Sequence, residues 1–572
     1  MSKYLHLSKT NCKHCYKCIR HCPVKAISFS SDSAHVEILP DDCILCGECY
    51  TICPQNAKSI RNDIDAAKKL ISGENKVYAS IAPSFVANYW GSDITALRES
   101  LLKLGFDDVF ETAVGATVVK NQFDHIVESK KQDIVISSCC HSINILIQKY
   151  FPQALPYLAQ VVSPMQAHSA MIKQDHPDSK TIFIGPCISK KAEAESESET
   201  PGSVDCVLTF GELSDWFAEE NISINTRNTQ TEEIGGKARF FPTTGGILRS
   251  MAADNPDYSY VAIDGVKNCI ETLKDILEGN IDKCFIEMSA CPGSCIGGPA
   301  MAKEKRSALR DRLTVEKYAL DAGGVDFCIQ QIHETDFRKV FNPHPVRKIF
   351  PGQKAIEEVL RSLGKKTPED ELNCGSCGYD TCKEKALAVL VGKADKTMCL
   401  PYLMEKAQSF SDNIISHTPN GVIVLNESLT IQKMNKAACR IMNVRDENDV
   451  LGMNAACVMD PDPLIHVLEE RNNTYEKRVY MVEYQRYVMQ TIIFDKEYNI
   501  VIIIMRDITE EEVGRSRKVD ICKQTIEITD KVIEKQMRSV QEIASLLGET
   551  TAETQIALTK LKETIYNEQF LH

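Results

Sequence analysis

The chain has 572 residues, which is enough for three to five domains that each bury a core and which excludes a single-domain protein. Its 66 Lys and Arg against 79 Asp and Glu give a net charge of −13, which argues against a nucleic-acid-binding surface. The first residues lack an apolar signal segment, and the longest apolar run, residues 499–505, is too short to span a bilayer. We therefore expect a cytoplasmic protein with no membrane or nucleic-acid partner. In such a large chain, 24 cysteines indicate metal binding or redox chemistry rather than disulfides.

Two cysteine runs occupy the first part of the chain, "CKHCYKCIRHCP" from Cys12 and "CILCGECYTICP" from Cys43. Each has the spacing C-x2-C-x2-C-x3-C-P of bacterial two-cluster ferredoxins, in which the fourth cysteine of each run binds the other cluster. Residues 1–62 are thus predicted to hold two [4Fe-4S] clusters. The first predicted ligand set is Cys12, Cys15, Cys18 and Cys53, and the second is Cys43, Cys46, Cys49 and Cys22. Zinc knuckles and reduced core cysteines are the alternatives. They are disfavoured because zinc sites show no duplicated fourth cysteine before proline.

Residues 75–350 contain three segments in which a buried strand is predicted to end at cysteine. "DIVISSCCHS" ends at Cys139 and Cys140, "TIFIGPC" ends at Cys187, and "IEMSACPGSC" carries Cys291 and Cys295. Because α/β domains place their chemistry where strand ends meet at a crevice, we expect these loops to converge.

The three segments together resemble the signature loops of [FeFe] hydrogenases, TSCCPxW, MPCxxKxxE and ExMACxGGCxxGG. The resemblance implies a two-lobed α/β catalytic domain that binds the H-cluster, a [4Fe-4S] cube joined to a two-iron subsite with CO and CN ligands. The implied ligands of the cube are Cys140, Cys187, Cys291 and Cys295, of which Cys295 also bridges to the two-iron subsite.

The same match implies roles for three further residues. Lys190 donates a hydrogen bond to a cyanide ligand, Cys139 carries protons to the distal iron, and Glu193 is a supporting carboxylate. For Lys190 and Glu193 the alternative is an ordinary solvated start of a helix.

The chain departs from the family pattern in its loops. Gly185 and Ser289 stand where catalytic members have methionine, and residues 141–143 read His-Ser-Ile in place of Pro-x-Trp. These changes alter the surroundings that tune a metal's potential and solvent access, so we expect a site that forms but turns over slowly.

The predicted helix in "GATVVKNQFDHIVES" departs as well. A loose alignment leaves Phe123 and Ile126 where the family has proton-path glutamates, and Asp124 or His125 could substitute for them.

Residues 351–403 carry a third cysteine group, with small residues between its members. It resembles the small iron-sulfur domain of the form CGxCGxxxC…CxP, which implies a third accessory [4Fe-4S] cluster. The predicted ligands are Cys374, Cys377, Cys382 and Cys399. A four-cysteine zinc site is the alternative.

Residues 405–510 resemble a PAS sensor domain in their predicted order of helices and strands and in the ending "RDITEEE". Four residues could touch a PAS cofactor, although core or surface positions are the more common outcome for such side chains. They are Cys439, Cys457, His417 and His466.

Residues 511–572 contain apolar residues at heptad spacing, which predicts a helix or helical pair that forms a homodimer. The heptad positions are Ile526, Ile533, Val540 and Leu547. The alternative is a helix packed on its own chain. No kinase nucleotide motif or DNA-binding helix pair follows, so we expect a signalling partner, a kinase or phosphatase supplied in trans.

The overall prediction is a multidomain α/β and α+β protein with three accessory clusters and an H-cluster. A sensory [FeFe] hydrogenase explains the PAS domain and the two lost methionines. A metabolic hydrogenase linked to ferredoxin is the first alternative, and a non-catalytic iron-sulfur protein without the two-iron subsite is the second. The expected partners of a hydrogenase are hydrogen, protons, ferredoxin or a similar electron carrier, and the maturation proteins that build the subsite.

Overall fold

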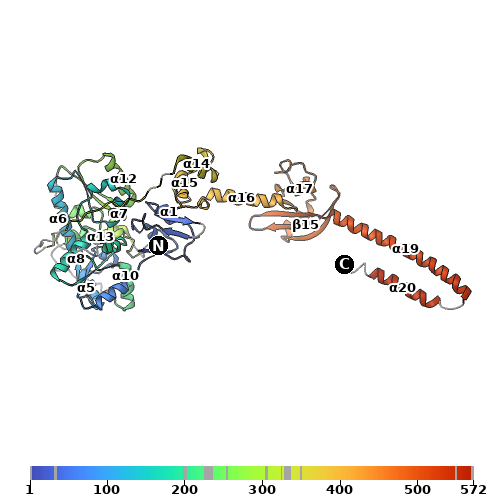
Figure 1. Cartoon of the computed structure of the whole chain (residues 1–572), viewed down its shortest axis with the longest axis horizontal. Coiled ribbons are helices and arrows are strands. Elements are labelled where there is room, and N and C mark those ends of the chain that lie inside the picture. The colour runs from blue at the N-terminus through green and yellow to red at the C-terminus, as the bar shows by residue number, and fades with distance from the viewer. Residues whose placement is uncertain are drawn as a thin grey trace. The chain divides into compact units, whose positions relative to one another are not determined.

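The computed structural model describes residues 3–30, 35–196, 203–224, 236–252, 255–302, 307–321, 323, 325–327, 337–347, 349, 351–547 and 551–567. The chain forms two compact units, Met1–Leu403 and Met404–His572, and Figure 1 shows the elements of each. The catalytic and cluster-binding cysteines predicted above all lie in the first unit.

The two N-terminal cysteine runs fold as two similar halves. The first half contains β1 (Leu5–Leu7), α1 (Lys17–His21) and β2 (Ile27–Ser30), and the second contains β3 (His35–Ile38), α2 (Glu48–Thr51) and β4 (Lys58–Ile60). β1 pairs with β4 and β2 with β3, both antiparallel, so each pair contains one strand from each half. This exchange of strands brings the fourth cysteine of each run toward the other half.

The next region contains two parallel sheets. One has the order β6-β5-β8-β9 and the other β10-β11-β7. β5, β7 and β11 are buried along their whole length and β8 along nearly all of it, as expected for parallel strands covered on both faces. The strands are β5 (Val77–Ile81), β6 (Asp108–Glu111), β7 (Ile134–Ile136), β8 (Lys180–Gly185), β9 (Cys206–Thr209), β10 (Ser259–Asp264) and β11 (Cys284–Ser289).

Helices surround both sheets. Their bounds are α3 (Ile64–Ile71), α4 (Phe85–Asn88), α5 (Ile94–Lys103), α6 (Ala113–Ser129), α7 (His141–Tyr150), α8 (Pro164–Asp175), α9 (Ser189–Ser196), α10 (Phe210–Glu219), α11 (Gly246–Ser250), α12 (Val266–Glu278) and α13 (Ala308–Asp321). The three predicted strands that lead to cysteine loops are confirmed as β7, β8 and β11. The multidomain α/β class is confirmed as well.

The third cysteine group lies between short helices. α14 (Gln353–Ser362) packs against α15 (Cys382–Leu390), and α16 (Leu400–His417) begins directly after Cys399. α15 therefore occupies part of the segment between Cys382 and Cys399.

The second unit contains a five-stranded antiparallel sheet with the order β13-β12-β16-β15-β14. Burial alternates along β12 and β16, which places one face of the sheet on the core. The strands are β12 (Gly421–Asn426), β13 (Ile431–Met434), β14 (Thr474–Met481), β15 (Arg486–Asp495) and β16 (Ile500–Asp507), and the helices are α17 (Lys436–Ile441) and α18 (Asp462–Glu470).

The chain ends in two long helices, α19 (Thr509–Leu547) and α20 (Thr551–Asn567), and α20 folds back along α19 (Figure 1). Lys562 of α20 forms an ion pair with Asp530 of α19 at 3.1 Å. The heptad residues Ile526, Ile533 and Val540 are half-buried, and the side chain of Leu547 lies outside the described residues. The heptad face thus lies partly on α20 of the same chain, which agrees with the alternative of a helix packed on its own chain. Among the helices described, none is long and apolar enough to cross a membrane.

Close packing of α6 on α8 depends on Gly115. A methyl group there would lie 2.5 Å from the carbonyl oxygen of Pro164 and 2.7 Å from the amide nitrogen of His168, both on the backbone of α8. We expect Gly115→Ala to lower the free energy of unfolding by about 2 kcal/mol, since overpacking forces the two backbones apart. Denaturant titration with hydrogen exchange of the α6 and α8 amides measures this. Gly211→Ala is the control, because its methyl group would meet only the Thr209 hydroxyl at 3.8 Å; equal effects of the two variants would contradict the prediction.

Candidate active site

The loops after β7, β8 and β11 meet around one cavity of about 120 Å³. It is lined by all five cysteines that the sequence placed in these loops, Cys139, Cys140, Cys187, Cys291 and Cys295. Cys295 is exposed to this space, whereas the other four are partly covered. The expected convergence of the three cysteine loops is therefore confirmed.

Four of these thiols lie close enough to influence one another. Burial raises the pKa of Cys295 to about 12, and neighbouring Cys187 and Cys140 add to the rise. Burial likewise raises the pKa of Cys291 far above its ordinary value, with Cys187, Cys140 and Cys295 contributing. A buried cluster of thiolates is unstable without a cation, so this donor set fits a bound iron-sulfur cube.

Lys190 lies at the wall of the cavity. Its ammonium donates to the carbonyl oxygen of Cys139 at 3.2 Å and to the carboxylate of Glu193 at 2.5 Å. Glu193 is completely buried, and although burial opposes its ionisation, the charges of Lys190 and Lys339 hold its pKa at about 2. Both residues are therefore buried partners of the cavity, and the alternative of a solvated start of a helix is wrong for them.

Glu287 is a further buried group at the cavity to which the sequence analysis gave no role. Its carboxylate accepts hydrogen bonds from the amides of Gly245, Ile247 and Leu248 at 2.9–3.2 Å. Burial nevertheless raises its pKa to about 7. Its position as the first letter of the loop-three motif was the signal that could have identified it.

The two positions that lack methionine differ in their surroundings. At Gly185 a side chain would meet the ring of Phe183 at 2.7 Å, and Phe183 itself lines the cavity. Ser289 is buried at the end of β11. The aromatic ring thus occupies the space into which a larger residue at 185 would extend.

The helix that was expected to supply proton-path groups presents none of its four named residues to the cavity. Phe123 packs on Phe285 in the core, and Ile126 belongs to the same cluster. Asp124 accepts from the amide of Ala252, and His125 is mostly exposed beside Glu128. None of Phe123, Asp124, His125 and Ile126 is among the residues that line the cavity.

The ferredoxin-like module reaches the same cavity through its second cysteine run. Leu45 and Cys46 line it, and the thiolate of Cys46 is close enough to raise the pKa of Cys291, after burial and the loop cysteines. Next to Cys46, Gly47 has φ +78°, and a methyl group there would lie 2.6 Å from Pro299 of loop three. Only a glycine lets these two loops approach so closely.

The eight ferredoxin cysteines fall into neighbouring groups. Burial raises the pKa of Cys46, and the thiolates of Cys22, Cys49 and Cys43 add to this rise. Cys18 has Cys12 and Cys15 as its thiol neighbours, and Cys15 is exposed. Cys53 lies beside Lys58, which also faces Cys18 and Cys49. Cys22 of the first run thus lies among the cysteines of the second, as the crossing rule requires.

The third cysteine group surrounds a cavity of about 20 Å³. Its lining includes all four of Cys374, Cys377, Cys382 and Cys399, together with the ammonium-bearing Lys385. Burial lowers the pKa of Lys385 to about 8, although Cys377 and Cys399 favour its charged form. Four thiols around one small space beside a buried cation fit a bound cluster.

The four candidate PAS ligands do not form a site. Cys439 belongs to the apolar core of the second unit, whereas Cys457, His417 and His466 are exposed. These positions agree with the alternative that the four residues are ordinary core or surface residues.

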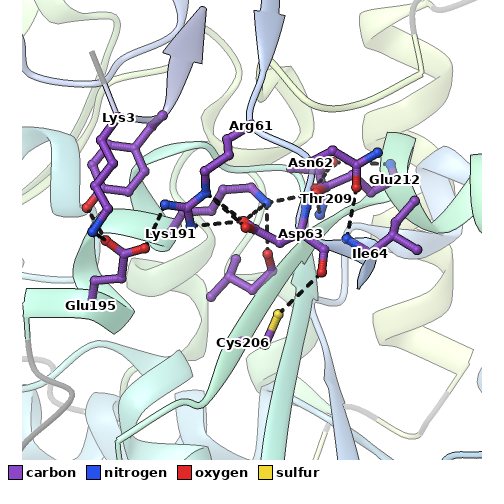
Figure 2. A network of polar contacts seen from close by, with 12 residues as sticks. Lys3, Arg61, Asn62, Asp63, Ile64, Lys191, Glu195, Cys206, Thr209 and Glu212 are labelled. Carbon is purple, nitrogen blue, oxygen red and sulfur yellow. Dashed lines mark hydrogen bonds and ion pairs between the residues drawn. The ribbon is translucent and has the colours of Figure 1, made fainter. Parts of the chain in front are cut away.

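A buried ionic network, which sequence reasoning missed, holds α9 against the ferredoxin-like module (Figure 2). The side chain of Lys191 is completely buried and donates to Asp63 at 2.6 Å, to Glu212 at 2.9 Å and to the carbonyl oxygen of Val207 at 2.9 Å. Asp63 follows the ferredoxin-like module, and Glu212 lies in the first turn of α10. Lys190, which lines the cavity, directly precedes Lys191, so the network that fixes Lys191 also positions Lys190.

A second part of this network ties the end of α9 to the N-terminus. Glu195 forms ion pairs with Arg61 at 2.7 Å and Lys3 at 2.5 Å, and it accepts from the hydroxyl of Tyr4 at 2.7 Å (Figure 2). The burial of Lys191 between Asp63 and Glu212 has no signal in the sequence, so only the fold assigns this role to it.

Family models match four segments of the chain. Residues 75–299 match the C-terminal domain of the iron only hydrogenase large subunit, and residues 5–54 match a 4Fe-4S dicluster domain. Residues 370–401 match an Fe-S cluster model and residues 419–510 a PAS domain. The chain therefore contains an iron-only hydrogenase large-subunit domain, a ferredoxin domain, an Fe-S domain and a PAS domain.

Curated proteins similar to the chain include two hydrogenases. Iron hydrogenase 1 of Clostridium pasteurianum is 25% identical over 52% of this chain, a match that spans 64% of that protein. The periplasmic [Fe] hydrogenase large subunit of Nitratidesulfovibrio vulgaris is 26% identical over 55% of this chain and 90% of that protein. The cytosolic Fe-S cluster assembly factor NAR1 of Yarrowia lipolytica is also similar, with 25% identity over 35% of this chain and 48% of that protein.

The buried Lys191 can be tested by removing its charge. We expect Lys191→Met to lower the free energy of unfolding by about 3 kcal/mol, because Asp63 and Glu212 then face each other without the shared cation. Denaturant titration followed by exchange of the α9 and α10 amides measures the change. Lys68→Met is the matched control, since Lys68 of α3 pairs with Glu219 of α10 at the protein surface and its loss should leave stability nearly unchanged. Equal losses in both variants would refute the assignment.

The raised pKa of Glu287 predicts a pH dependence of stability. The folded chain holds the proton up to a pH of about 7, compared with the ordinary value of 4.5, so stability falls as pH rises through this window. Gln cannot ionise, so the free energy of unfolding of Glu287→Gln should rise by about 3 kcal/mol relative to that of the unsubstituted protein as the pH goes from 4 to 8. Unfolding titrations across this range measure the difference, with Glu278→Gln on the surface as control. A difference that does not change with pH would disprove the prediction.

Proposed function

We propose that this protein, which joins an iron-only hydrogenase large-subunit domain to a PAS domain, is a sensory [FeFe] hydrogenase. The observation that carries the proposal is the single cavity that holds the four ligand cysteines together with Cys139 and Lys190. The match of residues 75–299 to the iron only hydrogenase large subunit supports the proposal. In this proposal the protein turns over hydrogen, detects it and lies in the cytoplasm.

In this proposal Cys140, Cys187, Cys291 and Cys295 would hold the cube, and Cys295 would also hold the two-iron subsite. When bound, this cofactor supplies the redox chemistry of 2H⁺ + 2e⁻ ⇌ H₂. Lys190 donates to Glu193 at 2.5 Å, and from this position at the cavity wall it would donate a hydrogen bond to a cyanide ligand of the bound subsite. Cys139 holds a proton at its Sγ beside the reacting centre, since it lines the same cavity without joining the four ligands.

Slow turnover follows from this arrangement. Residues 123–126 do not line the cavity, so the carboxylate of Asp124 on this helix lies away from the reacting site. The Phe183 ring fills the space beside Gly185. A protein that binds hydrogen but releases it slowly suits detection, because the occupied state then persists.

The ferredoxin sets and the third cysteine set then carry electrons, with Cys12, Cys15, Cys18 and Cys53 in one cluster and Cys22, Cys43, Cys46 and Cys49 in the next. Ferredoxin or a similar carrier exchanges electrons at the exposed Cys15. The PAS domain and the α19–α20 helices form the output, which acts on a kinase or phosphatase and dimerises through helix faces that α20 leaves exposed. These faces include Ile521, Ile528 and Val532.

Two other functions are distinguished by specific observations. A metabolic hydrogenase has no use for the PAS core that the second unit contains. A non-catalytic iron-sulfur protein is the second candidate, and similarity to NAR1 favours it. The buried Lys190 and Glu193 beside the exposed Cys295 favour a cavity that retains the two-iron subsite.

Removing the bridging thiolate tests the cofactor assignment. In protein matured with the enzymes that build the subsite, we expect Cys295→Ala to lose the infrared bands of CO and CN ligands while the accessory clusters remain, because no other thiolate joins the cube to the subsite. Cys284→Ala is the control, since Cys284 is buried in β11 and does not line the cavity. Persistent bands in Cys295→Ala would show that loop three does not bind the subsite.

The sensory assignment predicts a hydrogen-dependent change in the output region. We expect hydrogen exchange of residues 404–547 to differ between hydrogen and an oxidant, because a ligand shifts a conformation only if it stabilises one state more than another. Mass spectrometry of amide exchange measures this, and matured Cys295→Ala under hydrogen is the control that should show no change. Identical exchange combined with fast hydrogen turnover would favour the metabolic enzyme.

A further inference from the structure

The small Fe-S domain packs directly on α1 of the ferredoxin-like module, although more than 350 residues separate them in sequence. Gly378 has φ +92°, and a methyl group there would lie 3.0 Å from Ile19 and 3.2 Å from the amide nitrogen of Arg20. Its carbonyl oxygen accepts a hydrogen bond from Lys25 at 2.9 Å, and the guanidinium of Arg20 donates to Ser376 at 3.0 Å. The cysteine loop of the third set is therefore held against the module by its backbone.

Tyr379 lies between two cysteine sets. It is 4% exposed and belongs to one buried core cluster together with Cys377 and Cys22. The ammonium groups of Lys25 and Lys385 lie 5.7 and 5.5 Å from the centre of its ring. The region between Cys377 and Cys22 is thus filled by a packed aromatic side chain rather than by solvent.

A second contact fixes the same interface. Lys393 forms an ion pair with Asp42, which precedes Cys43, and the amide of Phe29 donates to the carbonyl oxygen of Lys393 at 3.0 Å. Both domains share one apolar core. Its buried members include Ile19, Ile27, Tyr379, Ala388, Ala394 and Met398.

Two of these contacts lie next to members of one cysteine set, since the amide of Lys25 donates to the carbonyl oxygen of Cys22 and Asp42 precedes Cys43. This set, Cys22, Cys43, Cys46 and Cys49, is called here the hub set. Cys46 lines the active-site cavity, and Cys49 is buried in one core cluster with Cys18 of the other ferredoxin set. Cys22, Tyr379 and Cys377 are buried members of the same apolar core cluster. The hub set therefore has three neighbouring cysteine sets.

We propose that the hub set is a branch point that sends electrons from the active-site cavity either to the exposed Cys15 side or to the third set at Cys374, Cys377, Cys382 and Cys399. The inference rests on the iron-sulfur assignments of the proposed function. Oxidation of one H₂ gives two protons and two electrons. Each electron that takes the second branch oxidises the hub cubane from [4Fe-4S]⁺ to [4Fe-4S]²⁺ and reduces the third cubane by one unit in return.

This branch ends at the start of a helix. Cys399 immediately precedes Leu400, the first residue of α16, and α16 continues to His417. Each electron that arrives adds one negative charge beside the N-terminal end of the helix, where negative charge interacts favourably with the exposed amide groups. The third set is thus the electron acceptor at the beginning of the segment that leads to the PAS domain.

The branch can be tested without hydrogen turnover. Protein produced without maturation enzymes keeps its cubanes but lacks the two-iron subsite, and photoreduction then fills the clusters with electrons. We expect the paramagnetic resonance of the third cubane, assigned by its loss in Cys374→Ala, to be split by magnetic coupling to the hub cubane. Gly378→Ala should abolish the splitting at unchanged iron content, because the methyl group separates the loop from α1.

Gly392→Ala is the matched control. Gly392 lies in the same small domain with φ +71°, and a methyl group there meets nothing within 4 Å, so the variant has similar backbone strain without the clash. Lys25→Met leaves the cysteine loop unchanged and should weaken the splitting. An unsplit third signal in the unsubstituted protein, the absence of a third cubane, or a splitting that survives both interface variants would overturn the proposal. Because the subsite is absent throughout, loss of the infrared bands in Cys295→Ala tests the proposed function separately.

Discussion

Thiolates that are buried together repel one another, and the first unit is arranged around this repulsion. Burial and neighbouring thiols raise the pKa values of Cys46, Cys291 and Cys295 far above that of a free thiol. Such sets become stable as thiolates only when a cation binds them, so metal binding and folding are coupled. The loops, the strand ends and the close approach of Gly47 to Pro299 all serve to bring thiols to these positions.

A buried lysine lies beside each cysteine set. Lys58 faces Cys18 and Cys49, and although burial opposes its charge, these thiolates raise its pKa. Lys190 lies at the cavity, where Glu193 and Cys187 favour its charged form against the effect of burial. Lys385 lies beside Cys377 and Cys399. A fixed ammonium group offsets part of the negative charge of a thiolate cluster and so contributes to its reduction potential.

The same ionic principle joins the domains. Lys191 connects the segment after the ferredoxin-like module to α9 and α10, and Lys393 connects the third set to Asp42. The ion pair of Lys191 is buried, so removing one partner leaves an uncompensated charge. These contacts fix how the domains that carry the cysteine sets pack on one another.

Sequence alone determined the cysteine sets and the elements that carry them. The spacing in the runs from Cys12 and Cys43, the three loops and the strands β7, β8 and β11 all follow from local patterns, because ligand spacing and continuous apolar runs are properties of short segments. The roles of Lys190 and Glu193 came from resemblance, and their burial agrees with it.

Tertiary structure alone decided which groups meet across long separations. Lys190 and Lys191 are adjacent and chemically identical, yet one lines the cavity and the other lies between Asp63 and Glu212. The packing of Gly378 on Ile19 and the filling of the space beside Gly185 by Phe183 were likewise beyond sequence reasoning. A side chain's partner depends on the path of the whole backbone, whereas the spacing of a ligand run depends only on a few consecutive residues.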